Sequence, residues 1–241
     1  MVSSRSVVST VDELLAVAGK AGACTIVVQG QLVGVPGFSL APGLTLEGQD
    51  EQALIAFAPG QDGLRLSTDN TVSTLRLEAN ADKRAIYNDT QVSTLGVLRL
   101  ADVVTIGQVQ ILARDQVRAG HVDVIGLDVV AADTRAQADR PQGFGVHVIQ
   151  GAFTLWNMQA DSQVVVTADL VDLSAGRPSA PVVGSGVFVS GPGFEQGRLS
   201  VRRLETGPIF SDGRIAPGTP DVITGGVFTV HGAYVDNVRT L

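Results

Sequence analysis

The sequence predicts an all-β fold in which successive coils of chain stack into a parallel β-helix. A phrase rich in β-branched residues occurs at 145–149, 186–190 and 226–230, with starts 41 and 40 residues apart. Aromatic residues make up only 5% of the chain and 28 residues are glycine, which suits many short strands joined by turns. A fixed repeat of this kind indicates stacked units, because no single unit can bury its apolar face alone.

One helix is expected, over residues 10–20. Thr10 followed three residues later by Glu13 forms a capping-box pattern, and Gly19 and Gly22 would end the helix. Four apolar residues share one helical face: Val11, Leu14, Leu15 and Ala18. A helix placed directly before the first strand of a coiled sheet would cover its open end.

Short strands account for the rest of the chain, because apolar residues alternate with polar ones in most segments. The expected strands are 25–32, 44–47, 53–57, 64–66, 74–77, 97–100, 103–112, 122–130, 146–149, 153–156, 164–168, 187–189, 199–201 and 227–230. Turn-forming pairs such as Pro59-Gly60 and Asp69-Asn70 lie between them.

The other all-β architectures fit less well. A parallel sheet built from βαβ units needs a helix at each crossover, and none is expected after residue 20. Hairpins of a sandwich should carry frequent tight turns, whereas Asp62-Gly63 and Asp212-Gly213 are the only candidates. The period fits one propeller blade or two coils of about 20 residues each, and no blade signature is present.

We therefore expect one β-helix domain over 1–241. No amphipathic or polar segment follows the last strands before Leu241, although the end of a solenoid needs a cap. The sequence thus predicts either a truncated chain or a homo-oligomer formed through that end or through a flank.

The opening helix, the strand Thr25-Ile26-Val27-Val28-Gln29-Gly30 and the segment Leu40-Ala41-Pro42-Gly43-Leu44-Thr45-Leu46-Glu47-Gly48 resemble the start of pectate-lyase-like proteins. The resemblance covers about the first 50 residues. It implies a right-handed parallel β-helix, in a superfamily of polysaccharide lyases, glycoside hydrolases, epimerases and phage tailspikes. No catalytic motif of that superfamily matches here, so the resemblance assigns no catalytic residue.

Composition excludes several classes of function. The net charge of −7 argues against a nucleic-acid binder, which needs clustered Lys and Arg. The single cysteine, Cys24, excludes an internal disulfide framework and a cysteine-based zinc site. No apolar run approaches the roughly 18 residues of a membrane span. No secretory signal is visible, so the chain is cytoplasmic as written or secreted after removal of a signal.

Five aspartates are candidates for acid–base chemistry. Asp123, Asp128 and Asp133 are five residues apart, and Asp169 and Asp172 follow, by our estimate, two coils later. Carboxylates stacked on neighbouring coils could reach the roughly 5–9.5 Å separation that glycosidases use. We expect the catalytic residues among Asp123, Asp128, Asp169 and Asp172. Oxygen ligands of this kind would also suit Ca²⁺, whereas the alternative is a set of solvated outward positions.

A second group would bind substrate. A polysaccharide lyase needs a base and a cation that neutralises the uronate carboxylate, roles that Tyr87 and Arg84 could fill. These two residues belong to a polar segment, Tyr87-Asn88-Asp89-Thr90 with Lys83 and Arg84 before it. A polar turn at a corner of the coil would explain this segment without any catalytic role. Arginine in and near the 207–218 loop could grip acidic sugars, or pair within a surface network. The predicted substrate-binding residues are Arg84, Tyr87, Asp89, His147, Trp156, Arg202, Asp212 and Arg214.

Two functions follow from these patterns. The first is a carbohydrate-engaging protein, with a lyase or hydrolase site in a lateral groove edged by loops 131–143, 174–185 and 205–225. The second is a non-catalytic structural or assembly module. No metal site is expected from the histidines, because His121, His147 and His231 do not occupy equivalent repeat positions.

Overall fold

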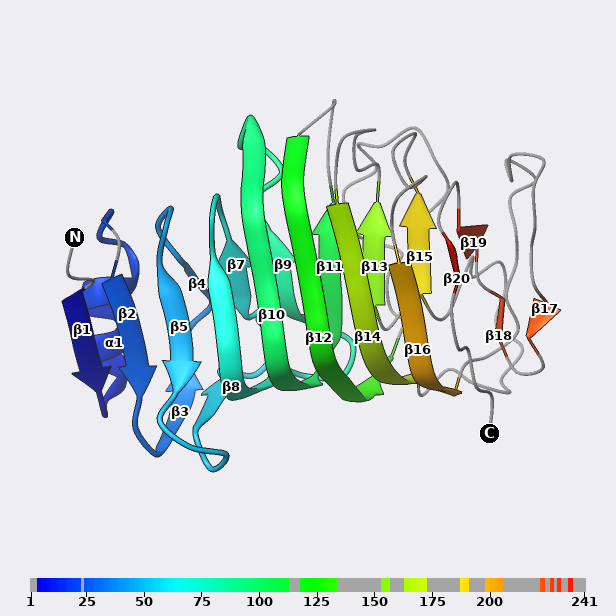
Figure 1. The fold of residues 1–241 in the computed structure, drawn as a ribbon. Helices are drawn as coiled ribbons and strands as arrows, with labels where there is room; N and C mark the ends of the chain where they lie inside the picture. Colours follow the sequence, from blue (N-terminus) through cyan, green and yellow to red (C-terminus); the bar gives the residue numbers. More distant parts are fainter. Residues whose placement is uncertain are drawn as a thin grey trace.

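The protein is a parallel β-solenoid whose strands form two sheets around one core (Figure 1). The computed structural model describes residues 4–22, 24–112, 118–133, 153–156, 163–172, 187–190, 198–205, 222–223, 226–227, 229–230 and 234–235. Every strand pair in the two large sheets is parallel. This confirms the predicted architecture, and the right-handed sense of coiling stays a prediction.

The larger sheet, here the front sheet, has 11 strands. Its order is β1 (Ser4–Val8), β2 (Cys24–Val28), β5 (Thr45–Gly48), β8 (Thr71–Glu78), β10 (Thr94–Ile106), β12 (Arg118–Ala132), β14 (Gln163–Asp172), β16 (Arg198–Glu205) and β20 (Tyr234–Val235). Two further strands, β3 (Gln31–Val35) and β6 (Leu54–Phe57), pair with each other, and β6 also pairs with β8.

The second sheet, here the back sheet, has seven strands and lies behind the front sheet in Figure 1. Its order is β4 (Phe38–Ser39), β7 (Leu64–Leu66), β9 (Arg84–Asn88), β11 (Gln108–Leu112), β13 (Phe153–Trp156), β15 (Val187–Ser190) and β19 (Thr229–Val230). A short antiparallel pair joins β17 (Val222–Ile223) to β18 (Gly226–Val227).

Coil length varies along the chain. Val8 pairs with Val28 and Val28 with Gly48, so each of these coils takes 20 residues. Val122 pairs with Val164, so one later coil takes 42. The interpretation of the 40-residue period as two coils is therefore wrong, because the period is a single coil with longer connections.

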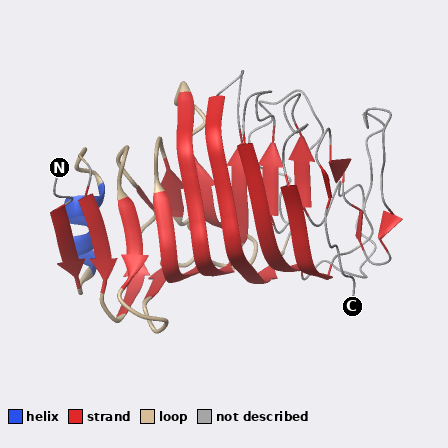
Figure 2. Ribbon diagram, in the orientation of Figure 1, coloured by secondary structure: helices blue, strands red, loops and turns tan. Residues whose placement is uncertain are grey.

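The predicted helix is α1 (Val11–Ala18), and its capping box is present. The Thr10 hydroxyl accepts from the Glu13 amide at 3.3 Å, and the Glu13 carboxylate accepts from the Thr10 amide at 3.1 Å. Leu14 and Ala18 are buried as predicted. Leu15 was predicted on the same apolar face, but it is exposed. The helix contacts β1 to β4 at the N-terminal end of the solenoid (Figure 2). No helix in the described part of the chain is long and apolar enough to cross a membrane.

The long strands of the front sheet bend where stacked residues adopt left-handed backbone conformations. Thr74 of β8 and Asp102 of β10 have φ of 50° and 52°, and their flanking residues pair with each other. Gly126 of β12 has φ 71° at the same level. A Cβ at Gly126 would lie 2.6 Å from the Asp102 Oδ1 atom, so a larger residue there would have to displace the Asp102 side chain.

Inward side chains from both sheets form one aliphatic core. Leu46 pairs with Val72, Val72 with Leu100 and Leu100 with Val124, and all four are buried. Each such side chain stabilises the fold by about 1.5–3 kcal/mol through removal from water. Because side chains alternate along a strand, the residues between these positions point outward and build the functional surfaces.

Candidate functional site

The predicted site residues that the structure describes do not all lie on one sheet of the solenoid. The best-defined group is on the front sheet, where β10 and β12 run side by side. Arg99 pairs with Asp123, and on either side Val97 pairs with His121 and Ala101 with Ile125. The intervening residues Leu98, Leu100, Val122 and Val124 are buried in the core, so the three pairs share the outer face.

Arg99, His121 and Asp123 form one contact group, which we call the Asp123 cluster. The Asp123 Oδ2 atom lies 3.0 Å from the Arg99 Nη2 atom, and its Oδ1 atom lies 2.6 Å from the His121 Nε2 atom. The Asp123 side chain is 9% exposed, against 52% for Arg99 and 30% for His121. Asp123 thus points outward as expected but is not solvated, because its two neighbours cover it.

The carboxylate of Asp123 fixes the imidazole. An ionised carboxylate only accepts hydrogen bonds, so a neutral His121 ring carries its proton on Nε2, the nitrogen that faces Asp123. Asp123 is the only hydrogen-bond partner of the Arg99 side chain among the described residues, which leaves the other guanidinium nitrogens for a ligand. The cluster therefore joins an oriented base to a half-exposed cation.

Aliphatic side chains edge the Asp123 cluster on the same face. Val97 is 46% exposed beside His121, and Ile125 is 47% exposed beyond Asp123. Exposed aliphatic groups around a buried ion pair create a surface that can exclude water when a ligand covers it.

The other predicted catalytic aspartates do not converge with Asp123. Asp123 and Asp128 lie in the same strand, β12, but on either side of its bend at Gly126. Asp128 therefore lies on the part of the front sheet beyond the bend. It pairs with Asp169, which places these two residues one coil apart and not two. Asp172 pairs with Ala132, still further along the strand. No group of three or more His, Cys, Asp or Glu side chains that could hold a metal ion occurs among the described residues, and Ca²⁺ binding stays a prediction.

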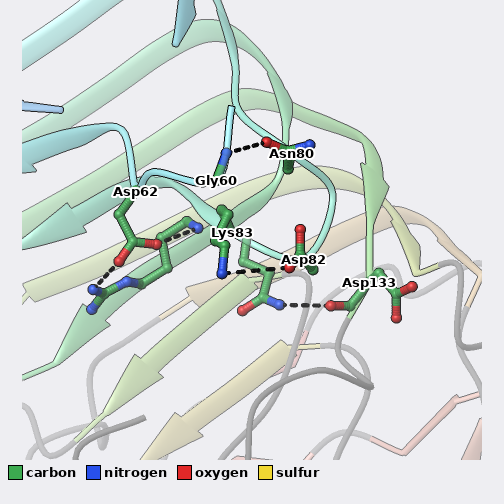
Figure 3. Close-up of polar contacts among 8 residues, drawn as sticks. Gly60, Asp62, Asn80, Asp82, Lys83 and Asp133 are labelled. Atoms are coloured by element: carbon green, nitrogen blue, oxygen red, sulfur yellow. Dashed lines mark hydrogen bonds and ion pairs between the residues drawn. The ribbon is translucent and has the colours of Figure 1, made fainter. Parts of the chain in front are cut away.

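Arg84 and Tyr87 lie on the back sheet, in strand β9, so the interpretation as a polar turn is wrong for these two residues. The Arg84 guanidinium forms an ion pair with Asp62, and its Cζ atom lies 4.1 Å from the centre of the Tyr87 ring. The Asp62 carboxylate also accepts from the Arg84 amide at 2.8 Å. Figure 3 shows Asp62 at this corner, near Asn80, Asp82 and Lys83.

Asp89 has a structural role after the end of β9. Its amide donates to the Leu66 carbonyl at 2.7 Å, and its Oδ1 atom accepts from the Gln91 amide at 2.9 Å. These contacts are those of a turn that connects neighbouring coils, with no sign of a ligand-binding arrangement.

The two sheets face away from each other across the core, so Arg84 and Tyr87 cannot share a groove with Asp123. The remaining candidates add little: Trp156 ends β13 and Arg202 lies within β16, while His147, Asp212 and Arg214 lie outside the described residues. Most of the three predicted groove loops lies outside them as well.

Sequence reasoning missed Arg99 and tested His121 only as a metal ligand. A signal was present, because His121 and Asp123 are separated by one buried valine and must share a face of a strand. Arg99 could be added only from the register of β10 against β12, which the sequence does not state.

Comparison with protein-family models, with curated proteins and with solved structures yields no match to this chain. The assignment of a function therefore depends on the Asp123 cluster and on the fold.

Proposed function

We propose that the protein binds an acidic polysaccharide on the outer face of the front sheet and cleaves it by β-elimination at the Asp123 cluster. The observation that carries the proposal is the buried Asp123 carboxylate holding His121 at 2.6 Å and Arg99 at 3.0 Å. The resemblance of the first 50 or so residues to pectate-lyase-like proteins points to the same class of substrate. A parallel sheet also offers a straight surface on which outward positions recur about every 4.8 Å, which suits a linear polymer.

Each member of the cluster has a role in this reaction. Arg99 pairs with the uronate carboxylate and stabilises the negative charge that develops there. His121, oriented by Asp123, removes the proton from the carbon next to that carboxylate. The bond from the sugar to the bridging oxygen then breaks, and that oxygen takes up a proton. The products are an unsaturated sugar and a new reducing end, with no water consumed.

The test uses a panel of polyuronates and neutral polysaccharides, with ultraviolet absorbance of the unsaturated product and reducing-end release as the two readouts. We expect turnover of a polyuronate and a loss of about 100-fold or more in His121→Gln, because general base catalysis contributes roughly 10²–10⁴-fold. Arg99→Gln should lose turnover as well. Arg5→Gln is the matched control, since Arg5 is an exposed arginine that pairs with Glu47 on the same sheet.

Two results would contradict any role of the Asp123 cluster in cleavage. One is the absence of product from every acidic polymer on the panel. The other is full activity of His121→Gln, which would mean that the imidazole has no part in the reaction. Release of reducing ends without an unsaturated product would instead indicate hydrolysis and would also overturn the elimination mechanism.

A second candidate function is a non-catalytic assembly module. The edge strand β1 favours it, because β1 has a strand neighbour on one side only within the described residues, and its Val7 is 56% exposed. An open edge with an apolar side chain can pair with another chain. Light scattering coupled to size exclusion tests this: wild type should be oligomeric and Val7→Lys monomeric. A monomeric wild type at high concentration would exclude it.

A further inference from the structure

A row of polar side chains crosses the outer face of the back sheet. Ser39 pairs with Arg65, Arg65 with Tyr87 and Tyr87 with Gln110. Their strand neighbours Leu64 and Ile86 are buried in the core, so Ser39, Arg65 and Tyr87 share the outer face, whereas Gln110 at the end of the row is itself buried. The row lies on the opposite side of the solenoid from the Asp123 cluster.

Arg65 is exposed and held in one orientation. Its Nε atom donates to the Ser39 hydroxyl at 2.8 Å, which is the only hydrogen bond that the Arg65 side chain makes among the described residues. The two terminal nitrogens therefore present their donors to solvent. A guanidinium fork with this orientation matches the two oxygens of a carboxylate. Because the hydroxyl already restricts the side chain, less conformational entropy is lost on binding.

Arg84 has the opposite role, although the sequence favoured it as the binding residue. Its guanidinium pairs with Asp62 and lies over the Tyr87 ring, and its side chain is only 20% exposed. Arg84 thus supports the ring from one side and is not available to a ligand. Tyr87 remains half-buried on the strand next to Arg65, which leans away from it toward Ser39.

We propose that Arg65, oriented by Ser39 and flanked by Tyr87, anchors a second binding surface for a carboxylate-bearing sugar. The carboxylate accepts two hydrogen bonds from the terminal nitrogens of Arg65. The tyrosine offers its ring edge to the apolar side of the sugar and its hydroxyl to a ring oxygen or hydroxyl. This surface does not depend on the reaction proposed for the Asp123 cluster, because the two lie on opposite faces.

Isothermal titration of the full chain tests the proposal. The probes are a tetrameric oligouronide, the same oligomer with its carboxylates reduced to alcohols, and inorganic sulfate. The His121→Gln, Arg99→Gln double variant serves as the background, so that the other face neither binds nor consumes the probe. We expect the oligouronide to bind this background, and Arg65→Gln to weaken it about tenfold or more, as loss of charged hydrogen bonds implies.

Three further variants sharpen the result. Arg65→Lys should weaken binding nearly as much as Arg65→Gln, because it keeps the charge and loses the fork. Ser39→Ala should weaken it less, and Arg5→Gln should leave it unchanged. Circular dichroism and the thermal midpoint should not move in any Arg65 variant, since the side chain is exposed.

The outcomes separate this surface from the proposed reaction. Loss of turnover in His121→Gln, together with Arg65-dependent oligouronide binding to the double-variant background, supports both. Absence of turnover in wild type would overturn the reaction and leave this surface standing if the oligouronide still binds through Arg65. No oligouronide binding to the background, equal affinity in Arg65→Gln, or equal affinity for the reduced oligomer or for sulfate would each overturn the second surface.

Discussion

Two carboxylates show how neighbours decide what a side chain does. Asp123 is buried beneath Arg99 and His121 and is placed to hold an imidazole in one tautomer. Glu13 is an exposed carboxylate that accepts hydrogen bonds from the amides of Ser9 and Thr10 and from the Ser9 hydroxyl. The first therefore belongs to the proposed chemistry, and the second belongs to the stability of the helix.

Glu13 should make the unfolding free energy of the protein depend on pH in the acidic range. Hydrogen bonds from the Ser9 amide, followed by the Ser9 hydroxyl and Thr10, lower the pKa of Glu13 below its ordinary value. A carboxylate with a lowered pKa in the folded state contributes fully above the unfolded pKa, about 4.3. That contribution disappears as the pH falls through the folded pKa. Urea unfolding of wild type and Glu13→Gln should therefore differ above about pH 5 and converge in stronger acid.

Glu51→Gln is the matched control for this measurement. Glu51 is exposed and has no hydrogen-bond partner among the described residues. Its variant should follow wild type at every pH. A constant difference between wild type and Glu13→Gln down to strong acid would contradict the proposed role of the ionised carboxylate.

At the scale of elements, the sequence predicted well those helices and strands whose bounds depend on interactions within the element itself. The capping box fixed the start of α1, and 64–66 and 153–156 were predicted with the bounds that β7 and β13 have. The short strand β4 and the polar strand β9 were missed, because they show little alternation of their own and form by pairing with neighbouring coils. For the same reason, Asp123 could be proposed from the sequence while its contact with Arg99 could not.

The contribution of Gly126 to the bend in the long strands can be tested by substitution. Gly126 has φ 71° and would place a Cβ 2.6 Å from the Asp102 Oδ1 atom. Gly30 has φ 73° with nothing within 4 Å of such a Cβ. Gly30→Ala should lose about 1–2 kcal/mol of unfolding free energy from backbone strain alone. Gly126→Ala should lose more, because the clash adds to the same strain.

Urea unfolding of the two glycine variants provides the comparison. Equal losses would show that the Asp102 side chain moves aside without cost. In that case backbone conformation alone would explain the bend.

At the scale of the whole molecule, each coil contacts mainly the coils next to it, so stability is shared between neighbours. The 20-residue coils near the helix lie close to the lengths expected from short strands and tight turns. The 42-residue coil was not foreseen, because a sequence period does not reveal how much of it is strand and how much is connection. The placement of the two polar surfaces on opposite sheets was not foreseen either, because the sequence pattern does not state to which sheet each strand belongs.

A core substitution should reveal this neighbour coupling. Leu100 is 1% exposed and pairs with Val72 and Val124 on the adjacent coils. Leu100→Ala should lower the unfolding free energy by about 3 kcal/mol, through lost burial and a cavity. Ile125→Ala, on the outer face and 47% exposed, should change it by less than about 0.5 kcal/mol. Hydrogen exchange should show the largest loss of protection in β8, β10 and β12 and a smaller loss in β1 and β2, whereas a uniform loss along the solenoid would mean that the coils unfold as one unit.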